Sequence, residues 1–435
     1  MIRQKTRATK ARRVAAGKAV VETRAPESAP RRGPGEDPVI WALSLVLTLL
    51  GLLVIFDAGF ARSIASGDGP IPVEFRNQLL FTVVSVAIGF GVSRVRGSFW
   101  QGSAGFWMGV AGLGLVAVKV IGTELNGAQR WVKIGPISVQ PAEFAKVATV
   151  LFLASVLASR KPWQEPSRIK DWADRLDRVW VPKLVRFMPA LLVLFYVYLV
   201  EREPDLGTAA VIGATGYFMF AFGGITKKSL IAVSLAGTLL VGAFVAQEPY
   251  RMERVFNHVH RWEDDRIDDV GYQTVQSEIA MASGGILGSG PGTGKVKHMM
   301  PAATTDFIFA TVAEEGGLIG VLFFLGTLGA LIWRLWELGF RCATRFGQAL
   351  CSGVALWLGL QASVNIMMAN GTLPAIGIPF PFISSGGSSL IALWIALGLC
   401  QAAAMMPSRE EGKSHANRSH RRGNRRARLS SARSR

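Results

Sequence analysis

The chain has 435 residues, of which 50% are hydrophobic and 18% are charged, and its mean hydropathy is +0.32. An ordinary soluble protein carries about 25% charged residues. Together with long apolar runs, this composition predicts an all-α polytopic membrane protein. It excludes a disordered chain, a coiled coil and a secreted disulfide scaffold.

The net charge of +18 at first resembles that of a nucleic-acid-binding protein. However, the 48 Lys and Arg residues concentrate in the two tails and in short loops between apolar runs. Such a distribution is typical of a protein at a membrane surface. No nucleic-acid partner is therefore expected.

Apolar runs long enough to cross a bilayer recur along the whole chain. A bilayer core needs about 20 apolar residues per helix, because each backbone polar group must be satisfied inside that helix. The expected spans lie at 39–60, 78–95, 104–121, 143–159, 184–200, 206–224, 229–247, 307–333, 347–369 and 380–406. About ten transmembrane helices are thus predicted.

An even number of spans places both tails on one side of the membrane. If that side is the cytoplasm, the inner segments hold 35 of the 48 Lys and Arg residues, as the positive-inside rule requires. The sequence therefore predicts cytoplasmic basic tails at 1–38 and 407–435, both disordered, around a membrane domain at 39–406. This topology predicts a multi-pass protein with both tails in the cytoplasm.

The longest loop, 248–306, then lies on the outer face between helices 7 and 8. A structureless loop of this length is unusual, so short helices and a function are expected in it. The stretch 271–281 has helical periodicity and predicts an amphipathic helix at the membrane surface. Gln276 lies in this stretch and is a candidate substrate-binding residue.

Asp306 stands at the junction of this loop and the eighth span. One interpretation is a helix N-cap, because Asp before an apolar run satisfies free N–H groups. The other is a catalytic carboxylate that accepts a proton from a substrate hydroxyl. Glu314 and Glu315 follow two turns into the same span, where ionisable groups normally face a cavity or pair with a cation.

Two further sets of charged residues are candidates for substrate binding. Glu143 and Lys146 are spaced i, i+3, so they either neutralise each other or serve a polar cavity. Arg130 and Lys133 lie on the outer side, against the positive-inside bias. They either anchor lipid headgroups beside Trp131 or bind an anion such as a pyrophosphate.

Three further stretches are considered as functional sites, two of them rich in glycine and one acidic. The stretch 288–295 departs from the P-loop pattern at Ser289 and Val296, and is interpreted as a flexible loop. The acidic stretch 264–269 has no calcium-loop spacing, so no metal ligands are assigned. The stretch 377–389 predicts broken backbone at membrane depth, which is tolerated in a polar cavity or inside protein. Its candidate substrate-binding residues are Ser384, Ser385, Gly386 and Ser388.

Several motifs occur in an order that resembles the SEDS family (shape, elongation, division and sporulation), to which FtsW, RodA and SpoVE belong. They are Asn126-Gly127-Ala128-Gln129-Arg130-Trp131, Gln140-Pro141-Ala142-Glu143-Phe144-Ala145-Lys146, Glu203-Pro204-Asp205-Leu206-Gly207-Thr208, Gly271-Tyr272-Gln273, Thr305-Asp306-Phe307-Ile308-Phe309 with Glu314-Glu315, and Pro381-Phe382-Ile383-Ser384-Ser385-Gly386-Gly387-Ser388-Ser389. The likeness covers about residues 39–406, and the extended tails favour the FtsW type.

The resemblance implies a glycosyltransferase that polymerises lipid II, a disaccharide-pentapeptide on undecaprenyl pyrophosphate, at the outer membrane face. It implies a class B penicillin-binding protein as partner, and other membrane proteins of the division or elongation machinery. Asp306 would be the general base for the acceptor's 4-hydroxyl. Arg130 and Lys146 would neutralise the leaving pyrophosphate. No cofactor is required by the sequence, although a divalent cation at the pyrophosphate remains open.

The chain departs from the family pattern around Asp306. Ala302 and Thr304 replace a usual Glu and His, and His298 stands where a Glu is common eight residues before the Asp. Two alternatives to a polymerase therefore stay open. One is a lipid II flippase that uses the same charged cavity, and the other is a non-catalytic scaffold that activates the penicillin-binding protein.

Overall fold

The computed structural model describes residues 33–67, 69–125, 128–135, 137–160, 171–223, 249–263, 271–300 and 302–407, with isolated positions between 231 and 242. The basic tails and most of the seventh expected span, 229–247, lie outside these residues. The acidic stretch 264–269 also lies outside them. Residues 32–407 group as one unit.

Apolar helices correspond to every expected span that falls on described residues. They are α2 (Pro38–Ala65), α3 (Val73–Arg94), α4 (Gly97–Ile121), α5 (Pro141–Ser159), α7 (Val181–Glu201), α8 (Leu206–Phe222), α12 (Ile308–Arg341), α13 (Arg345–Ala369) and α14 (Gly387–Ala404). Within the described residues, seven of these are long and apolar enough to cross a membrane, and α8 is a shorter apolar helix. The total of ten stays a prediction.

Local sequence signals set several helix boundaries. Asp37 caps α2, where its carboxylate accepts from the Val39 amide at 3.1 Å and Pro38 takes the first helical position. Asp205 caps α8 in the same way through Thr208, at 2.9 Å. The tenth expected span is wrong at its start, since α14 begins at Gly387 rather than near 380.

Strands, which the sequence did not predict, occur in the segment between α4 and α5. Three short antiparallel strands form there in the order β1 (Thr123–Leu125), β2 (Ala128–Ile134) and β3 (Ile137–Val139). The helices α10 (Pro249–Val259) and α11 (Tyr272–Gly284) lie in the long loop, as expected. Short helical segments are also present at α6 (Trp172–Arg175), η1 (Leu176–Trp180, a π-helix) and η2 (Val296–His298, a 3₁₀ helix).

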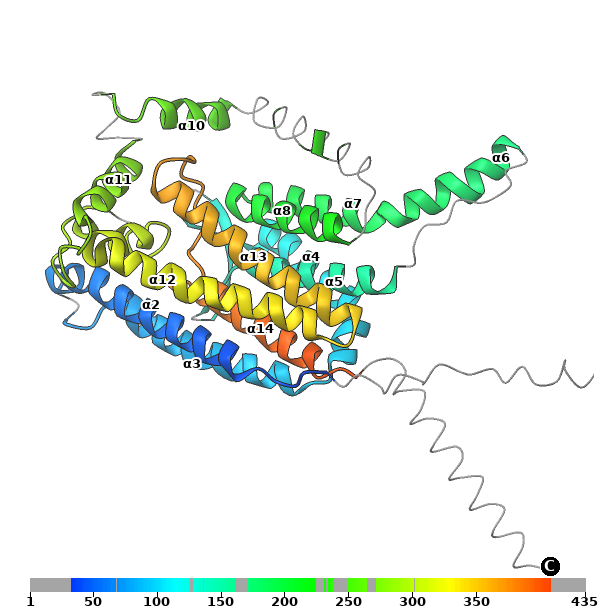
Figure 1. Ribbon diagram of the computed structural model, residues 1–435. Coiled ribbons are helices and arrows are strands. Elements are labelled where there is room, and N and C mark those ends of the chain that lie inside the picture. Colours follow the sequence, from blue (N-terminus) through cyan, green and yellow to red (C-terminus); the bar gives the residue numbers. More distant parts are fainter. Residues whose placement is uncertain are drawn as a thin grey trace, which may run out of the picture. The chain divides into compact units, whose positions relative to one another are not determined.

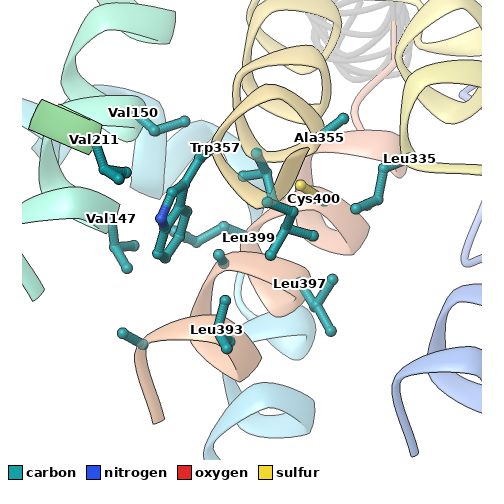
Figure 2. Packing of buried hydrophobic residues seen from close by; sticks show 14 of the residues in the cluster. Val147, Val150, Val211, Leu335, Ala355, Trp357, Leu393, Leu397, Leu399 and Cys400 are labelled. Atoms are coloured by element: carbon teal, nitrogen blue, oxygen red, sulfur yellow. The ribbon is translucent and has the colours of Figure 1, made fainter. Parts of the chain in front are cut away.

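The core is a bundle in which α14 packs against α3, α13 and α5, while α12 packs against α2 and α13 (Figure 1). Side chains from α5, α8, α12, α13 and α14 meet in its centre, among them Val147, Val211 and Trp357 (Figure 2). The helix α14 is buried along nearly its whole length. It therefore serves as the interior helix on which the others pack.

Candidate active site

A polar cavity of about 910 Å³ opens at the end of the bundle where α5, α8 and α12 begin. Its walls come from β2, the N-termini of α3, α5 and α8, the loop before α12, the broken segment before α14, and the helices α10 and α11. Charged residues of both signs line it: Arg62, Glu74, Arg130, Glu143, Glu253, Arg254, Arg261 and Asp306. Such a cavity suits a polar substrate better than an apolar one.

Asp306 lies in this cavity, two residues before the start of α12. The N-cap of α12 is Phe307, and no side chain caps the helix. The N-cap interpretation of Asp306 is therefore wrong, and its carboxylate is left for another role.

Hydrogen bonds fix the main chain around Asp306. The Asn365 amide donates to the Asp306 carbonyl at 2.8 Å and to the Ile378 carbonyl at 2.6 Å. The Ser384 hydroxyl donates to the Thr305 carbonyl at 2.6 Å, and the Ser385 amide donates to the Thr304 carbonyl at 2.9 Å. The loop before α12 is thus tied to α13 and to the broken segment before α14.

The pKa of Asp306 is raised to about 6. Burial is the largest cause, because it disfavours the charged carboxylate, and the nearby Asp205 adds to the rise while Arg130 opposes it. A carboxylate with a pKa near 6 is ionised at neutral pH yet basic enough to accept a proton. Asp306 therefore has the electrostatics of a general base.

Arg130 reaches the cavity from β2. Its guanidinium Nε donates to the Glu203 carbonyl at 3.1 Å, and its Nη2 donates to the Pro204 carbonyl. A guanidinium carries five N–H donors, so three remain for an anion in the cavity. Lys133 is exposed and does not line the cavity. The two residues are an odd number of positions apart on β2, which directs them to opposite faces of the strand.

Glu143 and Lys146 form a buried ion pair at 2.8 Å on α5, with 1% and 2% of their surfaces exposed. Lys146 also donates to Gln361 at 2.9 Å and lies over the Trp357 ring. Glu143 lines the cavity, whereas Lys146 does not. Both earlier interpretations thus hold in part, because the residues neutralise each other and the pair borders a polar cavity.

The broken segment before α14 is extended or turned over residues 377–386, as predicted, whereas residues 387–389 of the predicted stretch 377–389 are helical and begin α14. Ser385 and Gly386 line the cavity, and the Gly386 amide donates to the Gln78 side chain at 3.0 Å. Ser384 and Ser388 are buried outside it. Ser388 accepts from the Gln140 amide at 3.0 Å, which joins the start of α14 to the start of α5.

Glu314 and Glu315 lie away from the cavity and bind the glycine-rich loop. The Glu314 carboxylate accepts from the amides of Lys295 and Val296, at 2.8 and 3.2 Å. The Glu315 carboxylate accepts from the Gly294 amide and from Lys297, at 3.0 and 2.5 Å. The pairing expected for these acids is thus present, with the loop as partner.

The same loop repairs a break in α12. Gly317 has non-helical torsion angles, with φ of 57°, so helical hydrogen bonds are lost there. Main-chain bonds from Ser289 to Glu314, at 2.9 Å, and from Leu318 to Gly285, also at 2.9 Å, replace them. The interpretation of 288–295 as a flexible loop is therefore wrong, because these contacts hold it against α12.

Gln276 is half-buried on α11 and does not line the cavity. The neighbouring Ser277 is buried and donates to the Ala369 carbonyl at 2.7 Å. The helix α11 therefore packs against the bundle along this face, and its position at the membrane surface stays a prediction.

Several residues that lie around the cavity and act on its members were not singled out by the sequence. The Asp205 carboxylate raises the pKa of both Asp306 and Glu203. The Gln140 side-chain amide donates a hydrogen bond to the Asp205 carboxylate at 3.1 Å. Glu203 is fully buried, and burial and Asp205 raise its pKa to about 8. The motif Glu203-Pro204-Asp205 was the available signal. Asn365 had none, because a lone Asn in an apolar span resembles many interhelical contacts.

No group of three or more His, Cys, Asp or Glu side chains is placed to hold a metal ion in the described part of the chain. Single carboxylates such as Asp306 remain as possible ligands beside a substrate phosphate.

The comparisons with known proteins agree with this geometry. Residues 37–408 match the FtsW/RodA/SpoVE family, described as cell cycle proteins. The probable peptidoglycan glycosyltransferase FtsW of Idiomarina loihiensis is 33% identical over 84% of this chain and 86% of its own length. The protein of the same name from Dichelobacter nodosus is 34% identical over 85% of this chain and 91% of its own.

Solved structures give the same result for the fold. A chain from a study of polymerization and crosslinking by a peptidoglycan synthase complex matches with a TM-score of 0.67 and 30% identity, over 85% of this chain and 97% of that one. The rod shape determining protein RodA of Thermus thermophilus matches with a TM-score of 0.60 and 28% identity, over 85% and 96%. This chain is a multi-pass membrane protein, and it belongs to the FtsW/RodA/SpoVE family.

Proposed function

We propose that this chain is a peptidoglycan glycosyltransferase that polymerises lipid II into glycan strands at the outer face of the bacterial cytoplasmic membrane. The observation that carries the proposal is the position of Asp306, a carboxylate of raised pKa in a polar cavity that also holds Arg130. The names of its relatives, probable peptidoglycan glycosyltransferases, support the same activity.

In the proposed reaction, the Asp306 carboxylate accepts the proton of the acceptor's 4-hydroxyl. The acceptor oxygen forms a bond to the anomeric carbon of the donor sugar. The bond from that carbon to the pyrophosphate oxygen breaks, and undecaprenyl pyrophosphate leaves with the electron pair. The free N–H groups of Arg130 stabilise the negative charge that develops on the pyrophosphate.

The other cavity residues have supporting roles. Glu143 lines the cavity, and its carboxylate oxygen Oε2 is buried without a hydrogen-bond partner among the described residues. Lys146 holds Glu143 in place and does not contact the substrate. Ser385 and Gly386 form the wall next to Asp306.

A class B penicillin-binding protein is the proposed partner, with both tails of this chain on the cytoplasmic side. The similar chain from a peptidoglycan synthase complex that couples polymerization to crosslinking supports this pairing. If a divalent cation takes part, the substrate pyrophosphate and the Asp306 carboxylate would hold it, because Mg²⁺ is commonly held by one or two carboxylates and substrate phosphates, and it would supply positive charge to the leaving group. Chelation of divalent cations should then slow polymerisation, and added Mg²⁺ should restore the rate. An unchanged rate would exclude a role for a divalent cation.

Polymerisation of labelled lipid II tests the proposal. The chain would be purified with its partner, whose crosslinking serine is replaced, and moenomycin would suppress contaminating classical transglycosylases. Wild type, Asp306→Asn and the matched control Glu124→Gln would be compared, because Glu124 is exposed on β1 and does not line the cavity. Glycan ladders from wild type and control, with none from Asp306→Asn, are expected.

The alternatives give different results in this assay. A flippase or a scaffold gives no ladder from any of the three intact complexes. Ladders from all three would keep the glycosyltransferase and exclude Asp306 as its base.

A further inference from the structure

A second cavity, of about 570 Å³, lies between α5, α7, α8 and α13. These helices pack against one another in the bundle (Figure 1). The cavity is lined by Arg160 after the end of α5, Arg186 in the first half of α7, and Arg345 at the start of α13. None of the residues that line it lines the Asp306 cavity.

The second cavity lies at the opposite end of the bundle from Asp306. The helix α5 begins at Pro141, beside the cavity residues Gln140 and Glu143, and Arg160 follows its last residue. Its 19 residues span about 28 Å at 1.5 Å per residue, close to the thickness of a bilayer core. The helix α13 runs the other way, from Arg345 to the part that holds Asn365. The two cavities therefore open near opposite faces of the membrane.

The second cavity gathers positive charge without carboxylates among its described lining residues. Arg160 donates to the main-chain carbonyl of Arg186 at 2.6 Å, and its guanidinium lies 5.0 Å from the centre of the Phe220 ring. These contacts hold the side chain in place but do not neutralise it. No ion pair of Arg160 or Arg345 with an acidic side chain occurs within the described residues. Arg160 is partly buried, whereas Arg345 is exposed at the start of α13, and a partly buried cation is costly unless an anion joins it.

Apolar side chains form the rest of the wall. Leu157, Met219, Phe222 and Leu356 line the cavity together with the arginines. Phe222 is 69% exposed at the end of α8, so this apolar rim reaches the outside of the bundle. A ligand that fits has an anionic head and an apolar tail, which is the chemistry of a membrane phospholipid.

We propose that this second cavity binds the phosphate headgroup of an anionic phospholipid. The guanidinium groups of Arg160 and Arg345 contact the phosphate oxygens, since arginine matches phosphate geometry with several donors. The acyl chains leave past Phe222 into the bilayer. Basic pockets between transmembrane helices are known to hold such headgroups. Only the assignment of this face to the cytoplasmic leaflet rests on the proposed function.

Native mass spectrometry of the intact purified chain tests the proposal, with cardiolipin, phosphatidylglycerol or phosphatidylcholine added after delipidation. The test variant is R160Q/R345Q. The matched control is R94Q/R96Q, because Arg94 and Arg96 are exposed between α3 and α4 and lie outside the cavity. They lie at the same end of the bundle, since α3 starts beside the Asp306-cavity residue Glu74 and ends at Arg94. Both pairs remove two positive charges.

Wild type and R94Q/R96Q are expected to retain cardiolipin in preference to phosphatidylcholine. Their affinity for cardiolipin should be at least fivefold higher than that of R160Q/R345Q. R160K/R345K, which keeps the charges, should retain most of the binding. Equal loss in both glutamine pairs, or no loss in either, would overturn the proposal. Release of cardiolipin by millimolar inorganic phosphate would assign the arginines to a free anion and also overturn it. Asp306 is unchanged throughout, so the outcome is independent of the glycosyltransferase assay.

Discussion

Asn365 donates one hydrogen bond to the main-chain carbonyl of Asp306, at 2.8 Å, and a second to that of Ile378, at 2.6 Å. Asn365 is fully buried in α13, so these two bonds replace water for both carbonyls. A side chain in one helix thus sets the position of the proposed base, and it also fixes the broken segment opposite.

Replacing Asn365 by Ala should lower the polymerisation rate at least tenfold with little change in KM for lipid II. The physical reason is that two buried carbonyls lose their donor, at a cost of about 1–3 kcal/mol each, and the Asp306 loop relaxes. Steady-state kinetics of the purified complex measure both quantities. Asn370→Ala is the matched control on the same helix, because Asn370 is exposed at its C-terminal end. A rise in KM alone would contradict a positioning role for Asn365.

The buried pair of Glu143 and Lys146 should show strong coupling in stability. Glu143→Gln alone leaves the Lys146 ammonium buried without its partner, which costs about 3–5 kcal/mol. The double variant E143Q/K146M removes both charges and should have a higher Tm than either single variant. Thermal unfolding in detergent gives the comparison. If the loss of stability in the double variant equals the sum of the losses in the two single variants, the pair is not coupled.

The loop at residues 284–297 packs closely on the break in α12, so substitutions of glycines at this contact should lower stability. A Cβ on Gly288 would overlap the Glu315 carbonyl oxygen, and one on Gly317 would overlap the Gly288 amide. Both residues also have positive φ, at 79° and 57°. Gly288→Ala and Gly317→Ala should therefore each cost about 2 kcal/mol or more.

Gly316 is the matched control for these two, because a Cβ there meets no atom within 4 Å. Gly316→Ala should leave the Tm unchanged or slightly higher, since it restricts the unfolded chain. Limited proteolysis of residues 284–297 measures the same loop directly. Equal protection of all three variants would show that the loop does not depend on these close contacts.

Much of the fold follows from hydropathy alone. All nine expected spans on described residues coincide with helices, because a long apolar run in the sequence predicts a membrane helix. The short strands around Arg130 were not predicted, because three to seven residues between two spans give no clear periodicity. The start of α14 was placed too early, since Phe380, Phe382 and Ile383 are apolar but lie outside the helix.

The candidate site was predicted less completely than the fold. Asp306, Arg130, Glu143, Ser385 and Gly386 do line one cavity. The sequence could not show that Glu314 and Glu315 lie outside this cavity. An acidic residue in a membrane span indicates that it has a polar partner, but the sequence does not identify that partner. Their partner is a loop some 20 residues earlier in the chain, which only the folded structure brings to α12.

The pH dependence of glycan polymerisation tests the central claim, that the Asp306 carboxylate is the base, most directly. Its pKa is raised to about 6, and only the ionised form accepts a proton. The rate should therefore rise with pH through about 6 and level off above it. Asp205→Asn removes a negative neighbour, which favours ionisation of Asp306 and moves this rise to lower pH. Arg130→Gln removes a positive neighbour and moves the rise to higher pH. A rate that is flat from pH 5 to 8, or a rise that neither variant moves, would contradict the account.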